Sequence, residues 1–291
     1  MHSDARAQMV AALYVVATPL GNLRDITLRA LDVLASVDVV ATEDTRHTQR
    51  LLAHYAIRAR LIALHEHNEQ RAAGNIVGLL SEGKPIAYVT DAGTPAISDP
   101  GARLVARVRE AGLPVVPIPG PSAVTAALSA AGVSEPQFLF YGFPPSKAGA
   151  RRAALSALSS LPYTLVFFEA PHRLLQTLED MTHALGADRV IVIARELTKI
   201  FESFRRCKLG EARAWLAEDA NRVRGEFVLI VQGAHEPAAR CAGQAQRILE
   251  VLLGELPLKQ AVRLAAAITG AKKNALYDRA LEHQKQALNR A

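Results

Sequence analysis

Three polar turns are candidate binding elements for a small ligand, and each follows a short apolar run. They are Thr18-Pro-Leu-Gly-Asn22, Thr90-Asp-Ala-Gly-Thr-Pro95 with its continuation Ser98-Asp-Pro-Gly101, and Pro119-Gly-Pro-Ser122. Glycine allows a backbone to approach a ligand closely, and proline fixes the turn. In open α/β sheets, ligands bind beyond the carboxyl ends of the strands, where such turns gather. The three turns together therefore predict one small-molecule site at one edge of a sheet.

Motifs of several other enzyme classes are missing from the sequence. No G-x-x-x-x-G-K-S/T occurs, which argues against a P-loop NTPase, and no G-x-G-x-x-G follows the apolar run Leu13–Ala17. No G-x-S-x-G elbow occurs either. Cys207 and Cys241 make neither a disulfide framework nor a zinc site. His65 and His67 lack the further matched ligands of a metal site, so we expect a site without a metal.

The first half of the chain alternates short β-rich runs with amphipathic stretches. This rhythm predicts a mostly parallel sheet covered by helices on both faces. The expected strands are Leu13–Ala17, Val37–Thr42, Arg60–Leu64, Ile86–Thr90 and Val115–Ile118, and the expected helices are Thr27–Ala35, Thr45–Tyr55, Glu69–Ser81, Ala102–Ala111 and Ser122–Ala131.

The pattern breaks near residues 132–137, which indicates a domain boundary. Beyond it we expect a mixed sheet, because no regular helix separates every pair of strands there. Its expected strands are Phe138–Tyr141, Leu165–Phe168, Val190–Ala194, Phe201–Arg206 and Phe227–Gln232. A link rich in proline and alanine at Glu236–Ala242 leads into a helical tail. The fold class expected is α/β, with an N-terminal lobe at residues 1–131, a second lobe at 132–237 and a tail at 238–291.

Length and charge fit this division of the chain. The 291 residues are too many for one ordinary hydrophobic core, and 50% of them are apolar. No apolar run reaches the roughly 18 residues of a membrane span, and Met9–Leu20 reads as a strand entering a turn rather than as a signal peptide. We therefore expect a cytoplasmic protein without a membrane partner.

The tail carries most of the positive charge. Of the net charge of +6, residues 238–291 contribute +5, from 9 basic and 4 acidic side chains. Leu258 to His283 reads as two helices around Gly270, the outline of a helix-turn-helix. Lys272 and Lys273 are candidate contacts to RNA. The alternative is a helical hairpin that caps the fold or joins a dimer.

The turns also carry a resemblance to a known family. The chain resembles the tetrapyrrole methylase superfamily, and within it most closely the group that methylates small-subunit ribosomal RNA. The resemblance runs from about Leu13 to Gly233, and the tail resembles the helix-turn-helix appended in this group. The segments that carry it are Leu13 to Thr27, Glu43 to His47, Asp91 to Gly101, Pro119 to Ala123, Tyr141 to Pro145, Phe168 to Arg173, Arg195 to Lys199 and Gly225 to Phe227.

The resemblance implies a two-lobed fold that holds S-adenosylmethionine in the cleft between the lobes, usually as a homodimer. The reaction implied is 2′-O-methylation of a cytidine ribose in the decoding region of small-subunit (16S) rRNA, either free or in the assembled small subunit. Carried over position by position, the cofactor-binding residues would be Leu20, Asp91, Gly93, Thr94, Ser122, Ala123, Phe168 and Gly225.

Charged segments outside the turns supply candidates for catalysis and RNA binding. We hypothesise that Glu43 or Asp44 helps to deprotonate the ribose hydroxyl, while Arg46 or His47 holds the adjoining phosphate. Alternatively, Asp44 or Thr45 only caps the following helix. Three basic residues of the second lobe are candidate phosphate contacts, and intramolecular pairing with Glu169 and Glu196 is the competing explanation. They are Arg173, Arg195 and Lys199.

Two other functions compete with this reading. A methylase of a tetrapyrrole precursor would share the cofactor lobe, but the basic tail and the match at Glu43 to His47 argue against it. A non-catalytic RNA-binding assembly factor is disfavoured because the cofactor turns are intact.

Overall fold

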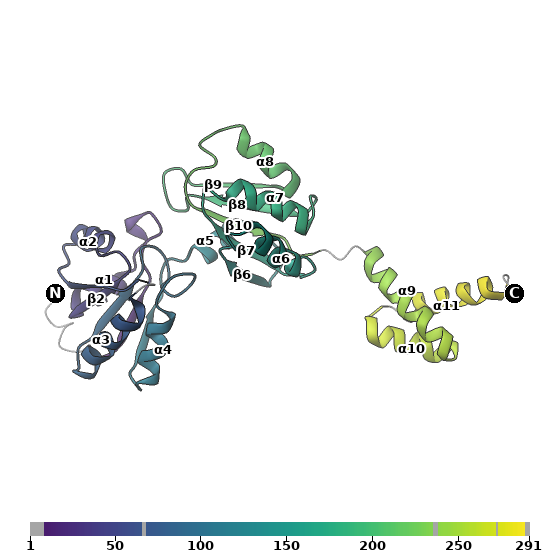
Figure 1. The fold of residues 1–291 in the computed structure, drawn as a ribbon, viewed down its shortest axis with the longest axis horizontal. Coiled ribbons are helices and arrows are strands. Elements are labelled where there is room, and N and C mark those ends of the chain that lie inside the picture. Colours follow the sequence, from purple (N-terminus) through teal and green to yellow (C-terminus); the bar gives the residue numbers. More distant parts are fainter. Residues whose placement is uncertain (1–8, 66–67, 235–237, 272, 289–291) are drawn as a thin grey trace. The chain divides into compact units, whose positions relative to one another are not determined.

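The computed structural model describes residues 9–65, 68–234, 238–271 and 273–288, and Figure 1 shows the order of the elements. The chain forms two compact units. One comprises residues 1–159 and 163–232, and the other residues 160–162 and 233–291. Most of both predicted lobes belongs to the first unit, whereas residues 160–162 and the chain from residue 233 onward, which includes the predicted tail, belong to the second.

The N-terminal lobe is built on a five-stranded parallel sheet with the order β3-β2-β4-β1-β5. The parallel sheet and its alternation with helices were predicted correctly. The strands are β1 (Leu13–Val16), β2 (Val39–Thr42), β3 (Arg60–Ala63), β4 (Ile86–Val89) and β5 (Val115–Ile118), and the helices are η2 (Leu23–Asp25), α1 (Leu28–Ser36), α2 (Thr45–His54), α3 (Glu69–Ser81) and α4 (Ala102–Glu110).

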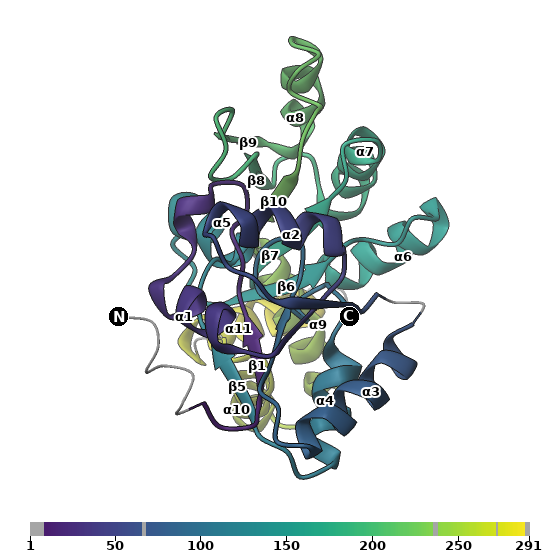
Figure 2. The same cartoon turned by 90° about the vertical axis from the view of Figure 1, so that its left-hand side faces the viewer.

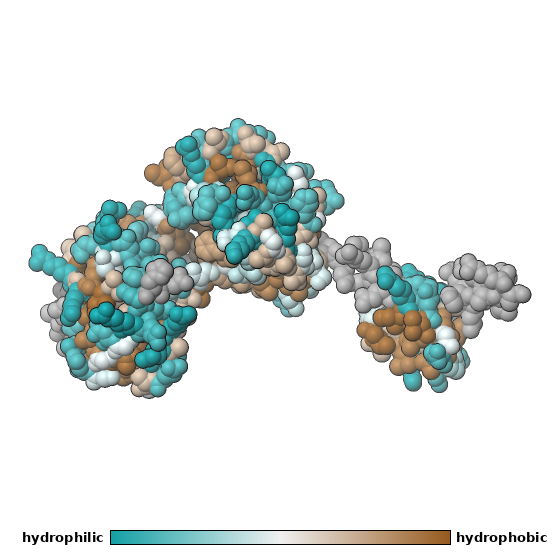
Figure 3. Space-filling view, viewed as in Figure 1, coloured by the Kyte–Doolittle hydropathy of each residue, from teal (hydrophilic) through white to brown (hydrophobic). Residues whose placement is uncertain are grey.

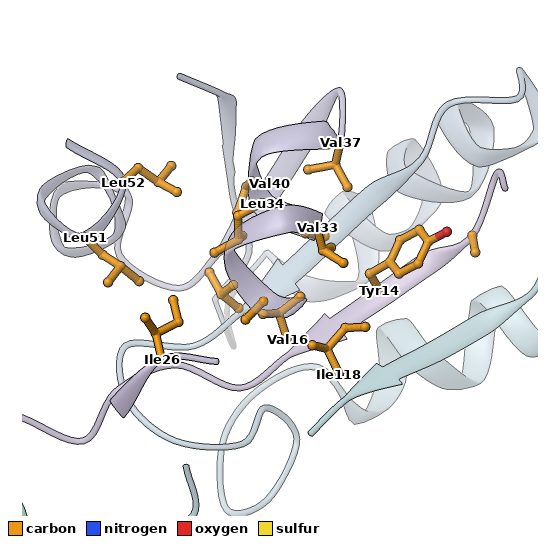
Figure 4. Packing of buried hydrophobic residues seen from close by; sticks show 14 residues of the cluster. Tyr14, Val16, Ile26, Val33, Leu34, Val37, Val40, Leu51, Leu52 and Ile118 are labelled. Atoms are coloured by element: carbon orange, nitrogen blue, oxygen red, sulfur yellow. The ribbon is translucent and has the colours of Figure 1, made fainter. Parts of the chain in front are cut away.

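Successive strand residues point to opposite faces of this sheet, and each face has its own core. On one face, Tyr14 and Val16 of β1 pack with Val33 of α1 and Leu52 of α2, as Figure 4 shows. On the other face, β1 contributes Leu13 to a cluster with α3 and α4. Figure 2 shows α1 and α4 on opposite sides of β1 and β5. The loops at the carboxyl ends of the strands therefore rest on a sheet that is buried on both faces.

The second lobe contains a mixed sheet, as predicted, and the strands lie in the order β6-β7-β10-β8-β9. Only β6 and β7 pair in parallel; the other neighbours are antiparallel. The strand that comes last in the sequence, β10, lies in the middle. The strands are β6 (Phe138–Gly142), β7 (Thr164–Glu169), β8 (Val190–Arg195), β9 (Ser203–Lys208) and β10 (Phe227–Val231), and the helices are α6 (Ala148–Leu158), α7 (Leu174–Leu185) and α8 (Leu209–Ala217).

Helix α5 (Ala123–Ala130) packs in a different lobe from the one expected. The sequence analysis assigned it to the N-terminal lobe, which it ended at residue 131. Its buried side chains Val124 and Ala127 join Val166, Val192 and Val228 of the second sheet in one core. The apolar face of α5 thus covers the mixed sheet, and the packing changes lobe at the 119–122 turn.

Within the second unit, three helices enclose a small core. They are α9 (Ala238–Glu255), α10 (Leu258–Thr269) and α11 (Lys273–Leu288). The prediction of two helices around Gly270 holds for α10 and α11, since Gly270 ends α10 with a φ of +69°. The tail was expected to be helical, but α9 was not identified as a separate helix. Residues 238–242 of the expected link lie within α9, because alanine-rich sequence favours helix. Residues 236 and 237 of that link lie outside the described residues.

Part of the surface of this unit is apolar. Val251 of α9 is 72% exposed and Ile268 of α10 is 62% exposed. Figure 3 shows apolar residues gathered on one face of these helices. None of the helices in the described ranges is long and apolar enough to cross a membrane.

Candidate active site

The three predicted turns are joined directly to one another. The backbone N–H of Thr18 donates to Gly93 O at 2.9 Å, and the N–H of Gly93 donates to Thr18 O at 2.9 Å. The Thr18 hydroxyl donates to Thr90 O at 3.0 Å. The Thr94 hydroxyl donates to Pro121 O, also at 3.0 Å. The expectation that the turns share one sheet edge is therefore confirmed, and their hydrogen bonds fix them as one surface.

This surface forms one wall of a cavity of about 410 Å³ within the first unit. The second lobe provides the other walls, from the ends of β6, β7 and β8 and the start of β10. Seven of the eight predicted cofactor residues line the cavity, and so does Glu43. The lining residues are Leu20, Glu43, Asp91, Ala92, Gly93, Thr94, Ile97, Ser98, Asp99, Ser122, Ala123, Val124, Phe143, Phe168, Glu169, Ala170, Pro171, Leu197, Glu226, Phe227 and Val228.

Gly225, the eighth predicted residue, has a different position. Of the described residues at this point of the chain, Glu226 and Phe227 line the cavity and Gly225 does not. Gly225 has a φ of +97°, and a Cβ there would lie 2.5 Å from the carboxyl carbon of Glu196. Its lack of a side chain makes room for that carboxylate. Gly225 thus acts on the wall indirectly, because Glu196 Oε1 accepts a hydrogen bond from the backbone N–H of the lining residue Glu226 at 2.9 Å.

The loop after β4 has an unusual backbone. Gly93 has a φ of +80°, and the non-glycine residues Ala96 and Ser98 have φ values of +66° and +61°. Such conformations cost side-chain-bearing residues free energy and persist where surrounding structure enforces them. A Cβ on Gly93 would also lie 3.3 Å from Leu20 Cδ2. The loop that lines the cavity is therefore held in one strained shape by its neighbours.

Three carboxylates, Glu43, Asp91 and Asp99, lie together in the cavity wall. Burial raises the pKa of Asp99 to about 6, and the charges of Glu43 and Asp91 add to the effect. Burial also raises the pKa of Glu43, helped by Asp91. Asp91 Oδ1 accepts a hydrogen bond from the backbone N–H of Asp44 at 3.2 Å, which ties the loop after β2 to the loop after β4. The site is thus acidic, and Asp99 is the carboxyl group whose pKa is raised to about 6.

Asp44 itself has a structural role in the first turn of α2. It is the N-cap of that helix, and its Oδ1 accepts from the backbone N–H of Arg46 at 2.7 Å. This hydrogen bond lowers the pKa of Asp44. The capping alternative is therefore confirmed for Asp44, whereas Glu43 is the member of this pair whose side chain lines the cavity.

The basic candidates of the second lobe are engaged within the chain. Arg173 lies 3.3 Å from Glu169 Oε1 and also donates to Pro144 O. Arg195 donates to Arg224 O at 2.6 Å and to Phe201 O at 3.3 Å. The expected pairing with Glu169 is therefore confirmed for Arg173, whereas Arg195 donates to backbone carbonyls and pairs with neither Glu169 nor Glu196 in the described contacts.

Lys199 is engaged in the same way, and the remaining candidates lie elsewhere. Its Nζ lies 3.0 Å from Glu196 Oε1 and 3.2 Å from Glu226 Oε2. Arg46 and His47 are exposed in the first turn of α2, and Lys273 is exposed at the start of α11. Lys272 lies outside the described residues. A role for these four in RNA binding stays a prediction.

Several lining residues were missed in the sequence. Asp99 stands within a matched motif, and the signal that could have singled it out is its place four residues after Pro95, in the same loop. Phe143 lies in another matched segment. Leu197 and Phe227 reach the cavity only because β8 and β10 are neighbours in the second sheet. The spacing of residues in the sequence does not show that these two strands pair.

Comparisons with known proteins agree with this geometry. The family profile described as tetrapyrrole (corrin/porphyrin) methylases matches residues 12–213. A second profile, the RsmI C-terminal HTH domain, matches residues 240–284. Among solved structures, the cobalamin biosynthetic enzyme cobalt precorrin-4 methyltransferase CbiF aligns with a TM-score of 0.58 at 19% identity, covering 76% of this chain and 95% of that one. Uroporphyrin-III-C-methyltransferase from Thermus thermophilus aligns with a TM-score of 0.57 at 20% identity, covering 76% and 94%. These likenesses concern the fold.

Relatives of much higher identity share one name, ribosomal RNA small subunit methyltransferase I. The protein from Escherichia coli O157:H7 is 54% identical over 94% of this chain and 95% of its own length. The one from Pseudomonas aeruginosa PAO1 is 50% identical, with coverage of 94% and 97%. The one from Neisseria meningitidis serogroup A is 51% identical, with coverage of 92% for both. The chain thus belongs to the tetrapyrrole (corrin/porphyrin) methylase family, and within it to the ribosomal RNA small subunit methyltransferase I group.

Proposed function

We propose that this protein methylates the ribose 2′-oxygen of a cytidine in the decoding region of small-subunit rRNA, with S-adenosylmethionine as methyl donor. The observation that carries the proposal is the identity of about 50% with small-subunit rRNA methyltransferases along nearly the whole chain, cavity and tail included. A methylase of a tetrapyrrole precursor is the weaker candidate, because the relatives with that activity share only the fold, at about 20% identity.

The residues of the cavity suit S-adenosylmethionine. When bound, the cofactor supplies a methyl group activated by a sulfonium. Its sulfonium and ammonium charges outnumber its single carboxylate, so it carries net positive charge, which the carboxylates of Glu43, Asp91 and Asp99 complement. Leu20 and Phe168 offer apolar walls. Ser122 occupies the N-cap position of α5 without making a side-chain capping bond, so its hydroxyl is available to a ligand.

Glu43 is the residue that we assign to proton transfer. A ribose hydroxyl is a poor nucleophile while protonated, and a carboxylate whose pKa is raised toward neutrality is a better proton acceptor. Burial and the charge of Asp91 raise the pKa of Glu43 in this way. Asp44 then acts as a positioning residue, because its cap and its hydrogen bond to Asp91 hold the backbone next to Glu43. The rigid loop after β4 contributes orientation, which supplies much of the rate in an in-line displacement.

In this proposal the RNA phosphates are bound by basic residues that lie away from the carboxylates of the cavity. Arg46 and His47 are exposed three and four residues after Glu43, which supports the proposal that they contact the phosphate beside the acceptor ribose. The basic second unit, with Lys272 and Lys273, anchors the RNA in a salt-sensitive manner. We further propose that the protein acts as a homodimer in the cytoplasm, where the small subunit is assembled.

Transfer of a tritiated methyl group tests this function. Isolated small subunits and naked rRNA are offered to the protein, and the modified nucleotide is mapped. We expect one 2′-O-methylcytidine in the decoding region. The variant Glu43→Gln should lower kcat by about 10²–10⁴-fold and leave cofactor affinity, measured by calorimetry, within a few-fold. Label confined to a base, or absent from both RNAs, would refute the proposal. An unchanged kcat in the variant would refute the role of Glu43.

A further inference from the structure

Two large apolar side chains line the cavity and are nevertheless half exposed. Phe143 follows β6 in the second lobe and is 50% exposed, and Ile97 lies in the loop after β4 in the N-terminal lobe and is 46% exposed. Exposed apolar groups in a concave site are the usual receptors for the apolar surface of a ligand. The two side chains therefore mark the open side of the cavity as a place for a flat, apolar group.

The backbone holds both side chains in position. Ile97 stands between Ala96 and Ser98, the two non-glycine residues of this loop with positive φ. Gly142, the residue before Phe143, approaches this loop so closely that a Cβ on it would lie 2.5 Å from Ser98 Oγ. The close approach links the loop of Ile97 to the strand end that carries Phe143. The subsite is thus built from both lobes.

Phe143 is also braced by a second aromatic ring. Its ring centroid lies 5.6 Å from that of Phe168, at an interplanar angle of 65°. Phe168 in turn packs edge-to-face with Phe140, with ring centroids 4.9 Å apart. Such pairs favour one arrangement of the rings over others. Phe143 is therefore a pre-oriented aromatic surface, half of which is still exposed to solvent.

The charge of the cavity restricts which part of an RNA can enter. Glu43, Asp91 and Asp99 line it, and of the described residues in its wall none is a lysine or arginine. A phosphate would be repelled by these carboxylates. A cytosine base and its ribose are neutral, so they can enter while the flanking phosphates stay at the rim. Single-stranded bases stack on aromatic side chains, and enzymes that act on a nucleotide commonly take it out of the stack.

We propose that Phe143, together with Ile97, receives the nucleobase of the acceptor nucleotide by stacking and apolar contact, and thereby directs its 2′-hydroxyl toward the carboxylates. This inference rests on the proposed function and adds to it a binding residue for the base. Stacking of a base on an aromatic side chain is worth about 1–3 kcal/mol, which corresponds to about 5- to 150-fold in kcat/KM.

A cycle of two substrates and two enzymes tests the proposal. Small subunits are reconstituted around rRNA that carries, at the mapped acceptor position, either cytidine or an abasic riboside; both retain the 2′-hydroxyl. On the cytidine substrate, Phe143→Ala should lower kcat/KM by about 5- to 150-fold. On the abasic substrate, kcat/KM of the wild type should be lower than on cytidine by a similar factor. The substitution Phe143→Ala should not lower kcat/KM on the abasic substrate any further. The conservative variant Phe143→Tyr should restore the rate on cytidine.

Controls separate stacking from other causes. Phe138→Ala is the matched control, because Phe138 is 49% exposed at the start of β6, the strand that Phe143 follows, and belongs to the described residues outside the cavity wall. It should behave like the wild type on both substrates. Cofactor affinity of Phe143→Ala should stay within a few-fold in calorimetry, and its thermal melting should stay cooperative. An equal loss on both substrates, or no loss on cytidine, would overturn the proposal. Failure of the wild type to methylate the cytidine substrate would instead overturn the proposed function.

Discussion

Replacing Asp99 with asparagine is expected to stabilise the protein at neutral pH. Burial, with help from the charges of Glu43 and Asp91, raises the pKa of Asp99 from an ordinary 3.8 to about 6. At 1.36 kcal/mol per pH unit, the cost of ionising this carboxyl in the folded protein is at most about 3 kcal/mol. Asp99 is only partly buried, so screening by solvent reduces the cost to about 1–2 kcal/mol. Asparagine keeps the shape and removes the charge.

The sign of the pH dependence follows from the raised pKa. The folded state binds the proton of Asp99 more tightly than the unfolded chain, so wild-type stability from this group falls as pH rises from about 4 to about 6. The advantage of Asp99→Asn should therefore be absent near pH 4, grow through this window and stay constant above about pH 7. For a unit of this size it amounts to roughly 2–8 °C in Tm.

Calorimetric melting of the free protein between pH 4 and pH 8 measures the effect. Asp32→Asn is the control, because Asp32 is exposed on α1 in the same lobe. Its melting curve should follow that of the wild type at every pH. A variant Asp99→Asn that melts below the wild type at pH 7.5, or whose difference from it does not depend on pH, would refute the reasoning. The same variant should bind S-adenosylmethionine more weakly, because the cavity loses part of its negative charge.

Two further substitutions test a close contact beside the cavity and a buried ion pair between α6 and α7. Gly142→Ala should destabilise the protein by about 1–3 kcal/mol in urea denaturation, since the new Cβ would meet Ser98 and Gly142 has a φ of +81°. The control Gly149→Ala has open space and lies in α6, so it should raise stability by about 0.5–1 kcal/mol; equal effects at the two glycines would contradict this account. Arg151→Ala removes a buried partner 2.7 Å from Asp180 and should cost about 3–5 kcal/mol, and a loss below 1 kcal/mol would show that the pair is dispensable.

Local sequence signals predicted the N-terminal lobe well. Alternation of apolar runs and amphipathic stretches located the five parallel strands to within two residues at each end, and turn residues located the ligand edge. Glu43 was identified as a candidate at this edge in the same way, because it follows a strand of that sheet. Each of these inferences depends only on neighbours within about ten residues of chain.

What the sequence did not show depends on contacts between distant segments. The helices α6 to α8, which lie between strands of the second lobe, were not predicted. Helix α5 was assigned to the wrong lobe, because an apolar helix face does not say which sheet it covers. The pairing of Arg195 with the carbonyl of Arg224 joins residues 29 positions apart. The raised pKa of Asp99 likewise comes from its burial in the folded chain and from the charge of Glu43, which the order of the strands brings near. Motifs give the residue types of a site, and the topology gives their environment.

The central position of β10 bears on how this enzyme emerges from the ribosome. Until residues 227–231 have been synthesised, β7 and β8 lack the strand that joins them, and both present unpaired backbone groups. The same strand brings Phe227 and Val228 into the wall of the cavity. A nascent chain that already contains all three turns therefore has an incomplete site. Because a ligand stabilises only the species that binds it, S-adenosylmethionine can protect the finished first unit from proteolysis but not its shorter precursors.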